Sequence, residues 1–134
     1  LLTISCAQQQ KKEETVPSQS SQKEVVQVIY FHGKQRCATC NAIETKTKNL
    51  LESAFDENIK NGQLEFKIID ISDKKNEAIA DKYEVTWSSL FIIKHRKGSE
   101  SVDNITEFAF ANARSNPENF RNGLRETIES ALKN

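Results

Sequence analysis

The 134-residue sequence contains no methionine, only two prolines and four glycines, and no excess of charge of either sign. Lys and Arg together number 19, as do Asp and Glu, so the chain lacks the strongly basic character of nucleic-acid-binding proteins. It also lacks any run of about 18 apolar residues, which excludes a transmembrane helix within this sequence. The length fits one domain with its own core rather than two.

The first 24 residues differ in character from the rest of the chain. Residues 1–7 are a short apolar stub containing Cys6, and residues 8–24 are polar or charged except Val16 and Pro17. Such a stretch cannot bury enough apolar surface to offset its ordering entropy, so we expect a disordered tether. Because a reading frame begins with Met, we also expect that a segment before Leu1 has been removed.

The stub and tether resemble the signal of a bacterial lipoprotein, in which small residues surround a cysteine that follows an apolar stretch. The resemblance implies that residues 1–24 are a residual signal and a tether, and that Cys6 is lipidated. A lipid anchor would place the domain outside the cytoplasm, on the periplasmic side of a membrane. Thr3 departs from the pattern, since Leu is commonest there, and the alternative is a ragged N-terminal strand with an unremarkable cysteine.

From Val25 onward the apolar pattern predicts one domain of alternating strands and helices. Short apolar, β-branched runs predict strands at residues 25–31, 64–71, 90–93 and, more weakly, 105–110. Apolar residues at helical spacing predict a first helix with a stripe from Ile43 to Phe55, ending at Asn61-Gly62, and a short helix at residues 75–83. The last helix has the clearest boundaries, with Ser115 or Asn116 as a cap before Pro117 and an apolar stripe from Phe120 to Leu132.

Two of the three cysteines form a Cys-x-x-Cys motif, Cys37-Ala38-Thr39-Cys40, directly after a strand and at the start of a helix. At a helix N-terminus the unpaired N–H groups and the helix dipole favour a thiolate over a thiol. Cys37 is therefore the expected nucleophile, and Arg36 directly before it is expected to stabilise its thiolate. Cys40, one turn later, is placed to attack a mixed disulfide and release the partner.

The element order and the position of this motif resemble the thioredoxin-like superfamily, over about residues 25–134. Residues 29–37, the strand ending at Asp70 and residues 82–86 match the same family. The resemblance implies an α/β thioredoxin-like fold with a central mixed four-stranded sheet and flanking helices. It also implies thiol–disulfide oxidoreductase activity at Cys37 and Cys40, a protein dithiol or disulfide as partner, and no organic cofactor.

Residues 104–114 resemble a narrower bacterial group. Its members are described as thioredoxin-like subunits of a nitrophenyl-compound nitroreductase, found alongside membrane thiol-electron carriers. That resemblance implies a membrane thiol carrier as the electron partner.

Three positions depart from the thioredoxin pattern. Arg36 stands where the family usually has Trp before the first cysteine. The family's buried acidic residue on the first strand has no counterpart here, and Tyr30 lies nearest its position. Ser89 stands where the family has a cis-proline, and a cis bond before a non-proline residue costs about 2.5–4 kcal/mol, so we expect a trans bond. The loop containing Trp87, Ser88 and Ser89 is expected to face the cysteines and contact the substrate.

Other roles for the cysteine pair stay open. A single Cys-x-x-Cys supplies two of the four ligands of structural zinc, with His32 as a conceivable third, and no metal is expected. A dithiol can also chelate a soft metalloid such as trivalent arsenic, as a non-catalytic binding module. A purely structural disulfide is a further alternative, although so small a loop removes little unfolded-chain entropy.

Overall fold

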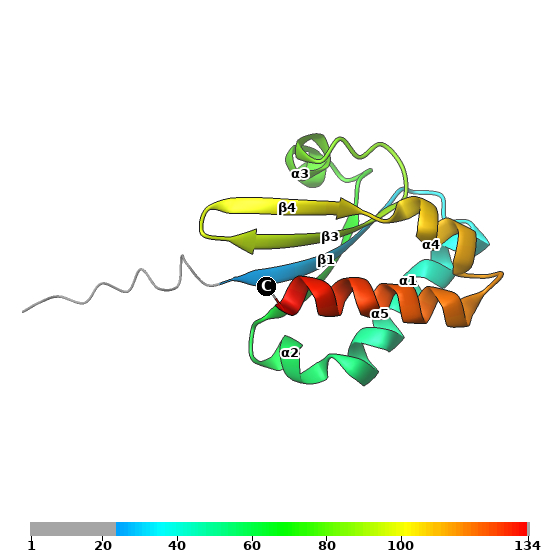
Figure 1. Cartoon of the computed structure of the whole chain (residues 1–134). Helices are drawn as coiled ribbons and strands as arrows, with labels where there is room; N and C mark the ends of the chain where they lie inside the picture. The colour runs from blue at the N-terminus through cyan, green and yellow to red at the C-terminus, as the bar shows by residue number, and fades with distance from the viewer. Residues whose placement is uncertain (1–23, 134) are drawn as a thin grey trace, which may run out of the picture.

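The computed structural model describes residues 24–133, which form a mixed four-stranded sheet covered by helices on both faces (Figure 1). The elements in chain order are β1 (Val25–His32), α1 (Ala38–Ala54), α2 (Asp56–Lys60), β2 (Leu64–Asp70), η2 (Lys74–Asn76), α3 (Glu77–Lys82), β3 (Ser89–Arg96), β4 (Ser99–Asn104), α4 (Thr106–Asn112) and α5 (Pro117–Lys133). Residues 1–23, which include Cys6 and all but the last residue of the predicted signal and tether, lie outside the described residues. No helix within residues 24–133 is both long and apolar enough to cross a membrane.

The sheet has the strand order β2-β1-β3-β4. β1 pairs in parallel with β2, and the pairings of β3 with β1 and β4 are antiparallel. Val28 lies opposite Phe66 on one side and Ile92 on the other, so β1 is central and its apolar run is buried on both faces. The predicted mixed four-stranded sheet with flanking helices is confirmed.

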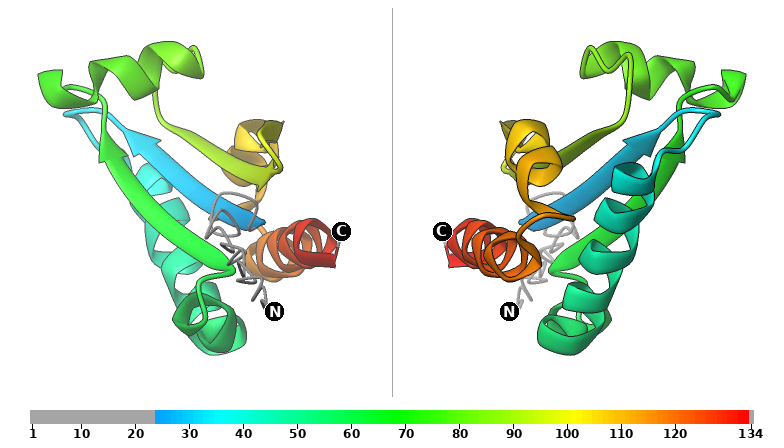
Figure 2. Two further views of the ribbon diagram at one scale, coloured as in Figure 1. Left: turned by 90° about the vertical axis from the view of Figure 1, so that its left-hand side faces the viewer. Right: turned by 90° about the vertical axis from the view of Figure 1, so that its right-hand side faces the viewer.

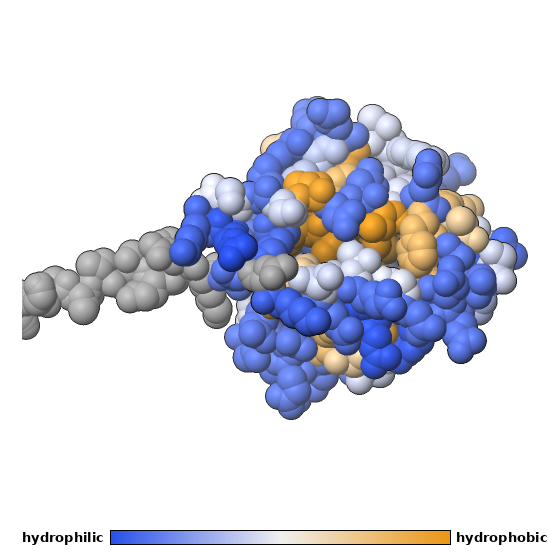
Figure 3. All heavy atoms as spheres, in the orientation of Figure 1, coloured by the Kyte–Doolittle hydropathy of each residue, from blue (hydrophilic) through white to orange (hydrophobic). Residues whose placement is uncertain are grey.

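Two apolar clusters lie on opposite faces of the sheet, because successive side chains of a strand point to opposite sides. The larger cluster packs Val28 and Tyr30 of β1 against α1, α4 and α5, whereas the smaller packs Ile29 and Phe31 against the region of α3. Figure 2 shows α3 on one side of the sheet and α1 and α5 on the other. The outer surface in the view of Figure 3 is mostly hydrophilic, with apolar surface gathered around β3 and α4.

The prediction of a strand at residues 105–110 is wrong. The fourth strand is Ser99–Asn104, and residues 106–112 form the helix α4. β4 is an edge strand whose residues are all exposed, so it has no apolar run by which a sequence pattern could reveal it. Ile105, Ala109 and Ala113 are linked in sequence by backbone hydrogen bonds of 2.9 Å, and this four-residue spacing is helical.

The boundaries of the other elements lie closer to the predicted ones. The first predicted helix breaks at Phe55 into α1 and α2, although its end at Asn61 and Gly62 is confirmed. β3 extends beyond the predicted residues 90–93. The first residues of the helix predicted at 75–83 belong to the 3-10 helix η2, which α3 follows. Of the two candidate caps for α5, Asn116 accepts the backbone N–H of Asn119 through its side chain at 3.3 Å.

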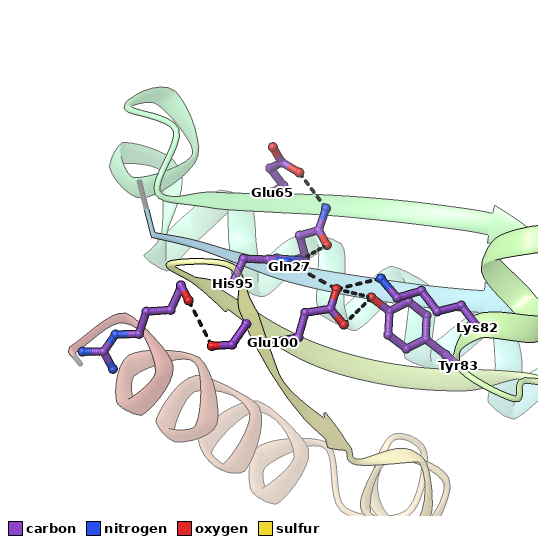
Figure 4. Close-up of polar contacts among 8 residues, drawn as sticks. Gln27, Glu65, Lys82, Tyr83, His95 and Glu100 are labelled. Atoms are coloured by element: carbon purple, nitrogen blue, oxygen red, sulfur yellow. Dashed lines mark hydrogen bonds and ion pairs between the residues drawn. The ribbon is translucent and has the colours of Figure 1, made fainter. Parts of the chain in front are cut away.

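A polar network ties β4 to α3 on the outer side of the sheet (Figure 4). The carboxylate of Glu100 accepts hydrogen bonds from Lys82 Nζ at 2.9 Å and from the Tyr83 hydroxyl at 2.9 and 3.0 Å. The hydrogen bond from Lys82 is the main reason that the pKa of Glu100 lies below its ordinary value, although partial burial raises it. The network therefore stabilises the fold more when Glu100 is ionised than when it is protonated.

We expect Glu100→Gln to lower the free energy of unfolding at neutral pH by no more than about 1 kcal/mol, because the network is partly solvated. A carboxyl group whose folded pKa is depressed contributes fully above its unfolded pKa of about 4.3 and loses that contribution as the pH falls through the folded pKa. The difference between wild type and variant should therefore shrink in acid. Urea unfolding at neutral pH and at about pH 3 measures it, and an undiminished difference in acid would contradict this account.

Candidate active site

Cys37 occupies the N-cap position of α1, where the chain is extended with φ −85° and ψ 172°. Its Sγ accepts the backbone N–H of Cys40 at 3.1 Å, as a capping oxygen would. The residue is exposed to solvent. Its sulfur thus lies at the positive end of a 17-residue helix, beside backbone N–H groups that have no partner within the helix.

Cys40 lies in the first turn of α1, directly behind Cys37. It is 6% exposed, and its Sγ lies 2.6 Å from Cys37 Sγ and 3.5 Å from Ser88 Oγ. Burial raises the pKa of the Cys40 thiol, but hydrogen bonds with Cys37 and Ser88 outweigh it, so that this pKa lies below its ordinary value. The arrangement pairs one sulfur that a large partner can reach with a second that it cannot.

Tyr30 supplies a buried hydroxyl group beneath the cysteine pair. It lies on β1, is fully buried, and donates a hydrogen bond to the backbone carbonyl of Cys40 at 3.1 Å. Burial raises the pKa of Tyr30 well above its ordinary value, so the phenol stays protonated and acts as a donor at neutral pH. The sequence analysis placed Tyr30 nearest the position where the family has a buried acidic residue. It did not predict that Tyr30 or Ser88 contacts Cys40.

We expect Tyr30→Phe to shift the thiolate titration of the reduced protein to higher pH. The Tyr30 hydroxyl is one of the groups that lower the pKa of Cys40, and its loss also removes a buried hydrogen bond, which costs about 1 kcal/mol of stability. Thiolate absorbance near 240 nm as a function of pH measures the shift. Tyr83→Phe is the matched control, since Tyr83 bonds Glu100 instead. An unchanged titration in Tyr30→Phe would contradict the effect of the Tyr30 hydroxyl on the pKa of Cys40.

Arg36 forms an ion pair beside the site. Its Nη2 lies 2.7 Å from Glu44 Oε1, and its Nε lies 3.4 Å from His32 Nδ1. Because the Glu44 carboxylate offsets the guanidinium charge, Arg36 contributes less positive potential at Cys37 than an unpaired arginine would. Stabilisation of the Cys37 thiolate by Arg36 stays a prediction. Nothing in the local sequence pattern indicated Glu44 as the ion-pair partner of Arg36.

The loop between α3 and β3 lies beside the cysteines. Ser88 and Ser89 are buried, whereas Trp87 is 63% exposed. A hollow of about 390 Å³ has a lining that includes Cys37, Cys40, Trp87, Ser88 and Phe110. Ser89 instead lines a second hollow of about 460 Å³, which Trp87 and Phe110 also line. All peptide bonds in residues 24–133 are trans, as expected before Ser89.

Phe110 is a residue of this site that sequence reasoning missed. It belongs to α4 and stacks on Trp87, with ring centroids 5.9 Å apart and an interplanar angle of 19°. The incorrect prediction of a strand at residues 105–110 concealed it. The four-residue spacing of Ile105, Ala109 and Ala113 is the signal that would have revealed the helix.

Among residues 24–133, no group of three or more His, Cys, Asp and Glu side chains lies close enough together to hold a metal ion. In this part of the chain, His32 does not join Cys37 and Cys40 in such a group.

The chain is similar to thioredoxins of solved structure, and the first of the two that follow supports the fold. A thioredoxin from Fasciola hepatica matches with a TM-score of 0.52 at 25% sequence identity, over 84% of this chain and 86% of that chain. A thioredoxin from Thermus thermophilus matches with a TM-score of 0.49 at 13% identity, over 83% of this chain and 78% of that chain. Neither a family model nor a curated protein matches the sequence. The chain has a thioredoxin-like α/β fold, with a Cys-x-x-Cys pair where α1 begins.

Proposed function

We propose that this protein is a thiol–disulfide oxidoreductase in which Cys37 attacks and Cys40 resolves. The observation that carries the proposal is the asymmetry of the pair: an exposed Cys37 sulfur at the helix N-terminus, with the buried Cys40 sulfur 2.6 Å behind it. A structural disulfide would gain nothing from an exposed first sulfur.

In the reducing direction, the Cys37 thiolate attacks one sulfur of a substrate disulfide. A mixed disulfide forms at Cys37, and the other substrate sulfur leaves as a thiolate that takes up a proton from solvent. The Cys40 thiolate then attacks Cys37 Sγ, forming the Cys37–Cys40 disulfide and expelling the second substrate thiol. Two electrons pass to the substrate, and a second dithiol must return them. The reverse sequence oxidises a substrate dithiol.

The cellular setting is also part of the proposal. The sequence around Cys6 supports lipidation and a membrane tether on the periplasmic side. The resemblance of residues 104–114 to the nitroreductase-associated group supports a membrane thiol carrier as the electron source. Labelling with radioactive palmitate in a bacterial host, compared between wild type and Cys6→Ala, tests the anchor directly.

Catalysed reduction of insulin disulfides by dithiothreitol tests the proposed activity. We expect the protein to accelerate precipitation of the insulin B chain at substoichiometric concentration. A protein that binds trivalent arsenic through its two thiols but gives no acceleration would instead be the non-catalytic binding module, and the proposal would fail.

A further inference from the structure

A third hollow, of about 560 Å³, lies between α5 and the hairpin formed by β3 and β4. In Figure 1 this hairpin runs alongside α5. The lining includes the apolar side chains of Ile92 and Ala131 and, at one end, Lys94 and Arg96. Lys94 pairs with Val26, near the start of β1, whereas the cysteines follow the end of that strand. The hollow is therefore separate from the site that contains the cysteines.

Lys94 brings a buried positive charge to this hollow. The residue is 9% exposed, and its Nζ is shielded from solvent and makes no hydrogen bond with any described residue. Among the described residues its ion-pair partner is Glu24, whose Oε1 lies 3.8 Å away, beyond hydrogen-bond distance. A buried ammonium group without acceptors is costly, because it has lost its hydration without gaining hydrogen bonds. An anion that supplied those acceptors would be bound favourably.

Arg96 adds a second positive charge, and it shares the same carboxylate. Lys94 and Arg96 are two positions apart on β3, so their side chains leave the same face of the sheet. Arg96 Nε lies 3.1 Å from Glu24 Oε2. One carboxylate therefore faces two cations, and the positive charge at this end of the hollow is only half balanced by Glu24.

The rest of the lining indicates what kind of anion fits. Ser101 lies directly opposite Lys94 in the β-ladder, and Ser130 of α5 brings a second hydroxyl group to the lining. Two cations with neighbouring hydroxyl donors suit a phosphate group, whose oxygens accept several charge-assisted hydrogen bonds. Glu100 is already bonded to Lys82, but Asp103 lies farther along β4 and places negative charge away from the hairpin turn. The lining therefore favours a compact anion at the end that holds the two cations.

We propose that Lys94 and Arg96 bind a phosphate group in this hollow and that Glu24 competes with it for the two cations. Free phosphate and the headgroup of a phospholipid both supply this chemistry. Glu24 directly follows residues 1–23, so a headgroup bound here would hold the domain against a membrane close to the predicted tether. The inference is independent of the proposed oxidoreductase function, because neither cation lines the hollow beside the cysteines.

Titration of the full chain with sodium phosphate at pH 7 tests the site, with sodium chloride keeping the ionic strength constant. We expect the ¹⁵N–¹H signals of residues 94–101 and 127–131 to shift in the wild type. Glu24→Gln removes the competing carboxylate and should tighten binding about two- to fivefold, the range of a partly exposed ion pair. Arg96→Gln removes a charged donor and should weaken binding at least about tenfold. Lys67→Gln is the matched control, because Lys67 is an exposed cation of β2 at the opposite edge of the sheet, and it should keep the wild-type affinity.

Sedimentation with phosphatidylcholine vesicles, with and without phosphatidylglycerol, distinguishes the two sources of phosphate. Binding to the phosphatidylglycerol vesicles that is lost in Arg96→Gln and kept in Lys67→Gln assigns the site to a lipid headgroup. Phosphate binding without vesicle binding assigns it to free phosphate. The side chains of Glu24 and Arg96 are both partly exposed, so these variants should retain the fold. Failure of both wild type and Glu24→Gln to bind either probe, or equal binding by Arg96→Gln, would overturn the inference.

Discussion

A Cys37→Ser variant should lose catalysed insulin reduction by more than about a thousandfold, the scale on which the loss of a catalytic nucleophile is felt. A serine hydroxyl is not ionised at neutral pH and does not attack a disulfide sulfur. Cys40 cannot take over the attack, because it is 6% exposed and lies behind Cys37. The initial rate of B-chain precipitation under dithiothreitol measures the loss.

The matched variant Cys40→Ser separates the two roles. It keeps the exposed Cys37 at the helix N-terminus and should still attack a disulfide once, but it should not turn over, because the resolving sulfur is gone. Both substitutions are nearly isosteric, so each variant should retain the fold. Full activity of Cys37→Ser would contradict the assignment of the nucleophile, whereas full activity of Cys40→Ser would contradict the resolving role.

Gly123→Ala should destabilise the protein, although the same change in an exposed helix ordinarily stabilises by roughly 1 kcal/mol. Gly123 lies in α5, and a methyl group there would overlap the ring of Phe108 from α4. That ring is stacked on Phe120, which is fully buried, with centroids 6.0 Å apart. Overpacking of this kind costs about 1–3 kcal/mol.

Urea unfolding followed by circular dichroism measures the effect of Gly123→Ala. Gly33→Ala is the matched control, because a Cβ at Gly33 meets no atom within 4 Å and its backbone is not left-handed. The control should unfold close to wild type. A Gly123→Ala protein as stable as wild type, or more stable, would show that α4 and α5 are not packed as closely as described.

The elements that bury a continuous apolar face could be predicted from the sequence. β1 is buried on both faces and appears as an apolar run, and α5 buries one stripe and begins at an asparagine cap. β4 could not be predicted in this way, since an exposed edge strand obtains its structure from backbone pairing with β3. Because the fourth strand was predicted at residues 105–110, the helix α4 and the position of Phe110 on it were not predicted.

The placement of the two cysteine sulfurs could be predicted from the local sequence more readily than the residues around them. A Cys-x-x-Cys at the start of a helix places one sulfur at the N-cap and the other one turn behind it, whatever the rest of the fold. The contact of Tyr30 with Cys40 joins residues ten positions apart on different elements, and that of Ser88 joins residues 48 positions apart. The partner of Arg36 depends on the path of the loop before α1. Such contacts depend on tertiary packing, which no local pattern encodes.

In the proposed mechanism, Cys37 forms the covalent intermediate and Cys40 resolves it. The most direct measurement treats reduced Cys40→Ser with a peptide disulfide, quenches with acid and identifies the adduct by mass spectrometry of proteolytic fragments. We expect one peptide bound per protein molecule, attached through a disulfide to the fragment containing Cys37, with no such adduct accumulating in wild type. Absence of the adduct from Cys40→Ser, together with its appearance at Cys40 in Cys37→Ser, would contradict it.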